Sequence, residues 1–294
     1  MTTLRLPGRV LELERGRPLL MGIVNASPES FSDGAEVSDL AAQLGRALEL
    51  TEQGADLIDV GGESGVTGVD PLDPRQEIER VVPLVERLAA EGITVSVDTW
   101  KPPVAQAVLE AGAAIINDVS GLRDPLIAEA CAAHGAGLVL MHTRAEPKHK
   151  DFPRYDDTVE DVLTFLRERL ALAAERGLDE QHIVVDPGPD FAKTPAETVE
   201  VLSRLNALHD LGRPVLLAAS RKDFIGAITG RSPRQRLAGS LAAVGEGVDR
   251  GATILRVHDV AETRDFLAVR DALRGVVKVS EELRLDEGLR REAT

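Results

Sequence analysis

The chain has 294 residues, which is enough for one large α/β barrel or for two domains of average size. Its 34 Lys and Arg stand against 49 Asp and Glu, and the formal net charge is −15. No basic patch or stripe is visible, so this charge argues against nucleic acid and against an anionic membrane as partners. Hydrophobic residues make up 43% of the chain but aromatic residues only 3%, so alanine, valine, leucine and isoleucine must form the core.

The cysteine content and the first residues predict a location. Cys131 is the single cysteine, which excludes an internal disulfide and suits a reducing compartment. We interpret it as a buried helical residue rather than a nucleophile. "MTTLRLPGRV" lacks the apolar core of a signal peptide, and no apolar run approaches 18 residues. We therefore expect a cytoplasmic protein.

Short apolar runs recur along the chain, and we interpret each as a strand. The eight runs cover residues 19–25, 57–62, 94–99, 114–120, 137–142, 183–188, 214–220 and 253–259. They are rich in valine, isoleucine and leucine without strict alternation, as expected of strands that are buried on both faces. Amphipathic stretches separate most of them, and several of these end in Gly-Ala, a helix stop signal.

Eight strand–helix repeats predict a (β/α)8 TIM barrel, in one domain that spans residues 1–294. A doubly wound open sheet is the alternative, but no G-x-G-x-x-G follows the first run. The stretch "TRAEPKHKDFPRYDD" predicts a long polar loop, and residues from about 280 to 294 form a charged tail.

Each predicted strand ends in a polar or ionisable residue. In such barrels the chemistry lies at the carboxyl ends of the strands. Burying these groups without partners costs roughly 2–7 kcal/mol each, so chance is a poor explanation for the set. We interpret five of them as ligand-binding, because their neighbours in sequence are strongly apolar: Asp98, Asn117, Asp186, Lys222 and Arg256. His142 is read as a core or supporting histidine, and Asp118 and Asp259 as helix caps.

The residue types indicate the ligand. Two carboxylates and an amide on interior strands can bind a nitrogen-rich ring. The set Asn25, Arg221, Lys222, Arg256 and His258 can meet an anion, with Mg²⁺ between them. No zinc-ligand spacing, H-E-x-x-H or G-x-S-x-G motif is present. The residues alone thus predict a barrel enzyme for a polar, nitrogenous, anionic small molecule.

A series of motifs resembles the dihydropteroate synthase family. The motifs are "MGIVNASPESFSDG", "GADLIDVGGES", "VSVDTWKP", "IINDVSG", "LVLMHT", "VVDPGPDFAKT", "SRKDFIG" and "LRVHDVAET", in the family's order between about residues 19 and 270. The resemblance implies a TIM barrel that joins 6-hydroxymethyl-7,8-dihydropterin diphosphate to 4-aminobenzoate. Pyrophosphate leaves through a dissociative, cation-like transition state. The family is usually dimeric, so a homodimer is expected.

The resemblance also implies roles for individual residues. Asp98, Asp186, Lys222 and Arg256 would be catalytic. The pterin would be held by Asp98, Asn117, Asp186 and Lys222, with Met141 on its face. The diphosphate would meet Arg256, His258 and Mg²⁺, with Asn25 as the metal ligand. The aminobenzoate pocket would be bordered by Phe191, Ser220 and Arg221, and the loop with Phe31 and Asp33 would close over the reacting centre.

Two segments depart from the family pattern. Residues 61–68 read "GGESGVTG" where "GGESTRPG" is usual, and "DPGPDFAKT" replaces "DPGIGFGKT", which places Pro189 and Asp190 near the second-substrate pocket. Two alternatives therefore stay open. One is a paralogue that binds pterin, or acts as a regulator, without synthase activity. The other is a pterin-dependent methyltransferase, against which "SRKDFIG" and "RVHDVAET" argue.

Overall fold

The computed structural model describes residues 2–26, 40–63 and 67–290. Eight parallel strands form a barrel in the order β8-β7-β6-β5-β4-β3-β10-β9. A bridge between Val185 and Val215 joins the two outermost strands. The strands are β3 (Leu19–Asn25), β4 (Leu57–Gly61), β5 (Val95–Asp98), β6 (Ile115–Asp118), β7 (Gly137–Met141), β8 (Ile183–Asp186), β9 (Leu216–Leu217) and β10 (Ile254–Val257). Each lies within one predicted run, so the predicted TIM barrel is confirmed.

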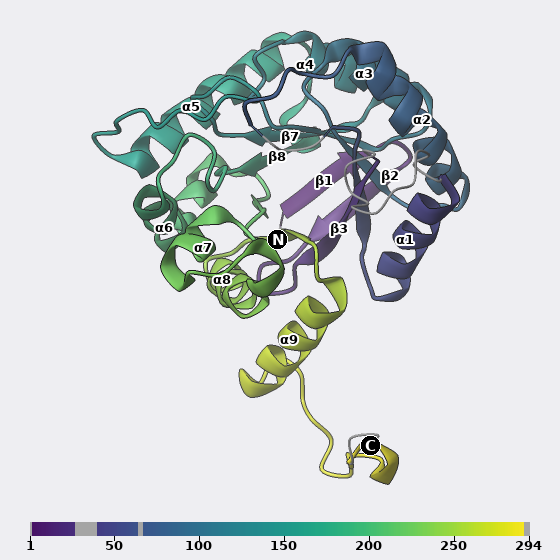
Figure 1. Ribbon diagram of the computed structural model, residues 1–294, viewed down its shortest axis with the longest axis vertical. Helices are drawn as coiled ribbons and strands as arrows, with labels where there is room; N and C mark the ends of the chain where they lie inside the picture. The colour runs from purple at the N-terminus through teal and green to yellow at the C-terminus, as the bar shows by residue number, and fades with distance from the viewer. Residues whose placement is uncertain (1, 27–39, 64–66, 291–294) are drawn as a thin grey trace.

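Helices surround the strands (Figure 1). They are α1 (Leu40–Glu52), α2 (Pro74–Ala90), α3 (Pro102–Glu110), α4 (Leu126–His134), α5 (Thr158–Glu175), α6 (Pro195–Ser203), α7 (Asp223–Thr229), α8 (Leu237–Asp249) and α9 (Val260–Leu273). Local sequence fixes several ends: Thr194 and Glu197 form a capping box at α6, and Gly135 ends α4 at φ 61°. Short 3₁₀ turns are η2 (Glu180–His182), η3 (Leu205–Leu211), η4 (Pro233–Gln235) and η5 (Glu287–Leu289).

The larger core lies between the strands and the helices, where branched aliphatic residues pack as the composition predicted. Cys131 is part of this core. It is fully buried in α4, and its Sγ lies 3.7 Å from the carbonyl oxygen of Gly137. Burial raises the pKa of the Cys131 thiol, so the thiol stays protonated. The structure thus places Cys131 as a packing residue.

A second core fills the barrel interior, and a hairpin that was not predicted contributes to it. Strands β1 (Thr2–Leu6) and β2 (Arg9–Leu13) pair antiparallel, and Figure 1 shows them across the barrel. The hairpin contributes the buried leucines Leu4, Leu6 and Leu13 to this core. The barrel strands contribute Met21, Leu57, Ile115, Val139, Val184, Leu216 and Ile254. The hairpin therefore closes the amino end of the barrel. The signal was present as alternating leucines around Pro7-Gly8.

The alternation of side chains in a strand places polar groups above this apolar ring. Residues two positions apart in a strand point the same way. Two residues beyond Leu57, Ile115, Val184 and Ile254 come Asp59, Asn117, Asp186 and Arg256 respectively. The barrel interior therefore changes from apolar to charged within one layer of side chains, toward the carboxyl ends of the strands.

Beyond α9 the chain leads away from the barrel (Figure 1), and residues 274–290 are exposed. Within the described ranges, the structure has no helix that is both long and apolar enough to cross a membrane.

Replacing Leu4 with alanine should lower the free energy of unfolding by about 2–5 kcal/mol, although Leu4 lies at the very start of the chain. The physical reason is its complete burial in the barrel interior. Urea unfolding would measure the change. The matched control is Val10→Ala in the same hairpin, whose side chain is 54% exposed and whose loss should change stability by no more than about 0.5 kcal/mol. Equal effects of the two changes would contradict this role of the hairpin.

Candidate active site

A cavity of about 760 Å³ opens at the carboxyl ends of the strands. Residues from β3, β5 and β10 line it, together with the loops that follow β7, β8 and β9. Of the predicted site residues, eight contribute to its lining: Asn25, Asp98, Phe191, Ser220, Arg221, Lys222, Arg256 and His258. Phe31 and Asp33 lie outside the described residues. Most of the predicted set therefore meets at one place, as expected for a TIM barrel.

Three predicted residues lie behind the cavity wall. Asn117, Met141 and Asp186 are only 2–3% exposed and are not part of the lining. Strand register nevertheless places them beside it, because Asp98 pairs with Asn117 and Met141 pairs with Asp186. They therefore lie close to the cavity without forming part of its surface.

Asp59 connects the interior polar groups, and sequence analysis missed it. Its carboxylate is fully buried and accepts hydrogen bonds from Ser96 Oγ at 2.6 Å and from Asn117 Nδ2 at 3.3 Å. Arg256 Nε donates to the same carboxylate at 2.6 Å. Side chains from four strands are thus bound to one another. The available signal was an aspartate inside the apolar run "LIDVGG".

Arg256 also binds Asp98, through Nη2 at 3.1 Å from the carboxylate. Burial raises the pKa of Asp98 to about 7, against the opposing effect of the Arg256 guanidinium. Burial likewise raises the pKa of Asp186, while the Gly188 amide, at 2.7 Å, and Lys222 act in the opposite direction. Two carboxyl groups at this end of the barrel can therefore hold a proton at a higher pH than an exposed carboxyl does.

The rim of the cavity carries paired cations. Arg221 binds the Asp259 carboxylate through two nitrogen atoms.

The predicted helix cap by Asp259 is wrong, because its carboxylate binds Arg221 and no side-chain capping bond forms at α9. Asp118 likewise accepts from Ser120 and Leu122 amides and closes a turn that precedes α4, rather than capping that helix.

Lys222 and His258 complete the rim. Lys222 Nζ lies 4.3 Å from the centre of the Phe191 ring. Burial lowers the pKa of Lys222, and Asp190 is the strongest of the carboxylates that oppose this shift. Burial also lowers the pKa of His258 to about 4, so it is neutral at pH 7, and its Nδ1 lies 3.0 Å from Ser220 Oγ.

A buried chain of polar groups supports the loop after β8. Lys193, 1% exposed, donates to His142 Nδ1 at 2.7 Å and to the carbonyl oxygens of Gly188 and Phe191, each at 3.0 Å. His142 Nε2 lies 2.9 Å from Asp161. Burial lowers the pKa of His142 to about 4, which leaves its Nδ1 free to accept. His142 therefore has the supporting role we gave as one reading, and Lys193 was missed.

A cluster of ion pairs joins the other loops of the rim. Lys101 Nζ binds Glu63 at 2.7 Å and Glu77 at 2.6 Å, and Lys148 Nζ binds Glu63 at 3.0 Å. Burial acts against ionisation of Glu63, but Lys101 and Lys148 outweigh it and lower the pKa of Glu63. The loops after β4, β5 and β7 are thus tied together.

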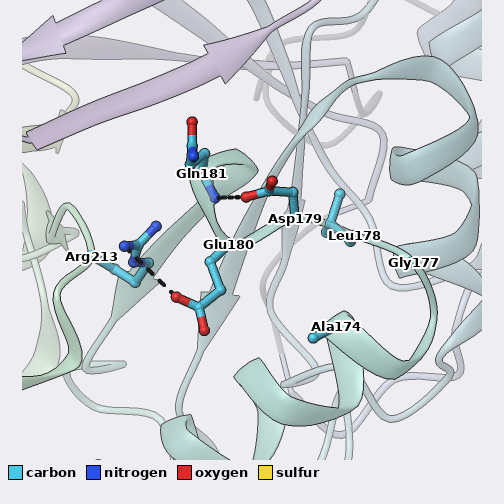
Figure 2. A pocket seen from close by; sticks show the side chains of 7 residues that line it. All are labelled: Ala174, Gly177, Leu178, Asp179, Glu180, Gln181 and Arg213. Carbon is cyan, nitrogen blue, oxygen red and sulfur yellow. Dashed lines mark hydrogen bonds and ion pairs between the residues drawn. The ribbon is translucent and has the colours of Figure 1, made fainter.

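A second hollow lies at the other end of the barrel strands (Figure 2). It is lined by the end of α5, by η2 and by Arg213, and its volume is about 440 Å³. Figure 2 shows Arg213 directed at Glu180, 3.7 Å away, and Asp179 accepting from the Gln181 amide. None of the predicted site residues in the described part of the chain lines this hollow, so we assign the active site to the carboxyl end.

Comparisons with known proteins identify relatives of this chain. The family model described as "Pterin binding enzyme" matches residues 21–258. The dihydropteroate synthase of Bacillus subtilis (strain 168) is 41% identical over 259 residues, which cover 87% of this chain and 89% of that protein. A structure of Xanthomonas albilineans dihydropteroate synthase with 4-aminobenzoic acid superposes with a TM-score of 0.86 at 45% identity, covering 94% of this chain and all of that one. A structure of the same enzyme with 7,8-dihydropteroate gives a TM-score of 0.83, also at 45% identity, covering 93% of this chain and all of that one.

The raised pKa of Asp98 predicts a pH dependence of stability. Between about pH 4 and pH 7 the folded protein holds a proton on Asp98 that the unfolded chain has lost, so stability falls as the pH rises through this window. Asp98→Asn cannot ionise. Its stability relative to the unmodified protein should therefore increase from pH 4.5 to pH 7.5, by on the order of 2 kcal/mol. Urea unfolding of both proteins at both pH values gives the difference in their free energies of unfolding. A difference that stays constant with pH would contradict the raised pKa of Asp98.

Proposed function

The chain belongs to the dihydropteroate synthase family of pterin-binding enzymes, and on that premise we propose the reaction that it catalyses. It joins 6-hydroxymethyl-7,8-dihydropterin diphosphate to 4-aminobenzoate and gives 7,8-dihydropteroate and pyrophosphate. The observation that carries the proposal is the buried set of carboxylates, amide and guanidinium around Asp59, which opens on a cavity large enough for a bicyclic ligand.

The pterin is assigned to the interior side of the cavity. Its proposed ligands are Asp98, Asn117, Asp186 and Lys222. Met141 lies on β7, between β6 with Asn117 and β8 with Asp186. Carboxyl and amide groups there can both accept from and donate to the nitrogen atoms of a 2-amino-4-oxo ring. Asn117 and Asp186 are only 2–3% exposed, so binding of the ring requires them to become accessible.

The diphosphate is assigned to Asn25, Arg256 and His258. Arg256 binds Asp59 through Nε and Asp98 through Nη2, and it also lines the cavity. His258, although neutral, can donate one N–H to a phosphate oxygen. Arg256 through its charge and His258 through its N–H would stabilise the negative charge that grows on the leaving pyrophosphate.

Mg²⁺ is the proposed metal. The described residues contain no group of three or more His, Cys, Asp or Glu suited to a metal, so an ion here depends on phosphate oxygens as well as on Asn25. This donor set fits Mg²⁺, which proteins commonly hold through one or two side chains and a substrate phosphate. When bound, the ion would supply charge neutralisation at the diphosphate.

The bond that breaks joins the pterin methylene carbon to the diphosphate oxygen, and its electron pair leaves with pyrophosphate. Asp98 and Asp186 stabilise positive charge on the pterin, while Arg256 and His258 stabilise the leaving group. The arylamine is neutral at pH 7 and attacks the methylene through its nitrogen, then loses a proton to solvent. The chain therefore needs no strong general base. Phe31 and Asp33 remain the proposed lid over this centre.

The alternatives make different predictions. A binding or regulatory paralogue would hold pterin without forming product, and a methyltransferase would need a corrinoid partner. The synthases among the relatives favour the synthase.

We further propose a cytoplasmic homodimer built from single-barrel chains. The exposed Ile228, Val269 and Leu273 offer apolar surface for such an interface, and light scattering would report the oligomeric state.

The central test is product formation. Purified protein with saturating pterin diphosphate, 4-aminobenzoate and Mg²⁺ should release equal amounts of pyrophosphate and dihydropteroate, measured by a coupled assay and by chromatography. Removal of Mg²⁺ with a chelator should abolish most of the rate. Pterin binding without any product would favour the paralogue.

Two substitutions should separate the two ends of the site. Asp186→Asn should weaken pterin binding by about 1–3 kcal/mol, because it removes a charged acceptor from the ring. Arg256→Ala should chiefly lower the rate with the diphosphate, by about 100-fold or more. Calorimetric titration with the pterin alone and steady-state kinetics give the two readouts. Intact pterin affinity in Asp186→Asn would show that the pocket is wrongly assigned.

A further inference from the structure

Asp190 occupies a backbone conformation that favours glycine. It lies in the loop after β8 with φ 66°, and Ala192 in the same loop has φ 53°. This chain reads "DPGPDFAKT" where the related motif reads "DPGIGFGKT". Asp190 and Ala192 therefore stand at two positions where that motif has glycine. A residue with a side chain costs roughly 1–2 kcal/mol in this region, somewhat less for aspartate. The aspartate side chain is therefore present in spite of a backbone cost.

The Asp190 carboxylate is fixed at the wall of the active-site cavity. It accepts the Phe224 amide at 3.2 and 3.3 Å and the Thr198 hydroxyl at 3.2 Å. The Asp190 amide in turn donates to Thr198 Oγ1 at 3.1 Å. Asp190, Phe191 and Lys222 all line the cavity. A negative charge is thus held on the wall that borders the proposed arylamine.

Two cations on this wall, Arg221 and Lys222, already face carboxylates. Arg221 binds Asp259 through two nitrogen atoms, and Asp190 is the carboxylate that acts most strongly on Lys222. Further out, Asp223 lies 3.1 Å from Arg236 and 3.6 Å from Lys150. A second substrate that brings its own carboxylate must therefore compete with Asp190 for positive charge and is repelled by it.

We propose that Asp190 is a specificity-determining residue for the second substrate, and that its charge lowers the preference of the site for 4-aminobenzoate over an arylamine with an uncharged hydrogen-bond donor in the para position. This inference rests on the proposed function and deepens it. The reaction itself is unchanged: the arylamine nitrogen bonds to the methylene carbon as its bond to oxygen breaks, pyrophosphate takes the electron pair, and the nitrogen loses a proton to solvent. A carboxamide N–H can donate to Asp190, whereas a carboxylate cannot.

The test compares 4-aminobenzoate with 4-aminobenzamide, which has nearly the same shape and no charge. Asp190→Asn keeps the size and an oxygen acceptor for the Phe224 amide, tolerates positive φ and removes the charge. The ratio of kcat/KM for the benzoate to that for the benzamide should rise by about three- to tenfold in this variant, because one unit of charge is removed near the substrate. Asp190→Gly should shift the ratio in the same direction.

Thr198→Val is the matched control. It removes the hydroxyl that holds Asp190 but keeps the charge, so the ratio should stay within about twofold of the unmodified protein. An unchanged ratio in Asp190→Asn, or an equal change in Thr198→Val, would overturn the proposal.

A binding measurement separates this proposal from the proposed function. Calorimetric titration of each arylamine into protein saturated with pterin and pyrophosphate gives the ratio of Kd values without turnover. Absence of product with both arylamines would reject the synthase reaction. The Kd ratio would still decide the role of Asp190: a shift toward the benzoate in Asp190→Asn supports it, and an unchanged ratio overturns it.

Discussion

The rest of the site depends on the hydrogen bonds that the buried Asp59 carboxylate accepts. This carboxylate is fully buried and binds side chains from three other strands, Ser96, Asn117 and Arg256. A buried carboxylate without partners would be strongly destabilising, and removal of one partner from such a pair costs about 3–5 kcal/mol. The guanidinium is consequently held where it also reaches Asp98. One carboxylate thus joins side chains from four strands and holds Arg256 beside the groups assigned to the pterin.

The two sides of the cavity differ in how their charges are satisfied. On the interior side, burial raises the pKa of Asp98 and Asp186. A carboxyl group that keeps its proton can donate a hydrogen bond to a ligand, and one that loses it can accept. On the rim, Arg221 and Lys222 are compensated by Asp259 and Asp190. The interior side is therefore suited to a nitrogen-rich ring, and the rim decides how much negative charge a second substrate can bring.

Much of the fold and site follows from position along the chain. Each of the eight apolar runs contains a barrel strand. Asp98, Asn117, Lys222 and Arg256 were predicted to lie together because polar residues at strand ends meet in such a barrel. Asp59 and Lys193 were missed for opposite reasons. Asp59 lies inside an apolar run, and Lys193 lies in a loop, where a lysine is normally exposed. Only the folded chain shows that each is buried with partners.

The sequence by itself determined the barrel, the end at which the site lies and the family, because these depend on periodicity and on motifs that are local in the chain. The tertiary structure alone decided which charges are paired. Asp259 binds Arg221 rather than capping a helix, and the Asp190 carboxylate meets the Phe224 amide, 34 residues away. Such pairings depend on distances between loops that follow different strands. Electrostatic energies change steeply with those distances and with burial, and neither is encoded in local sequence.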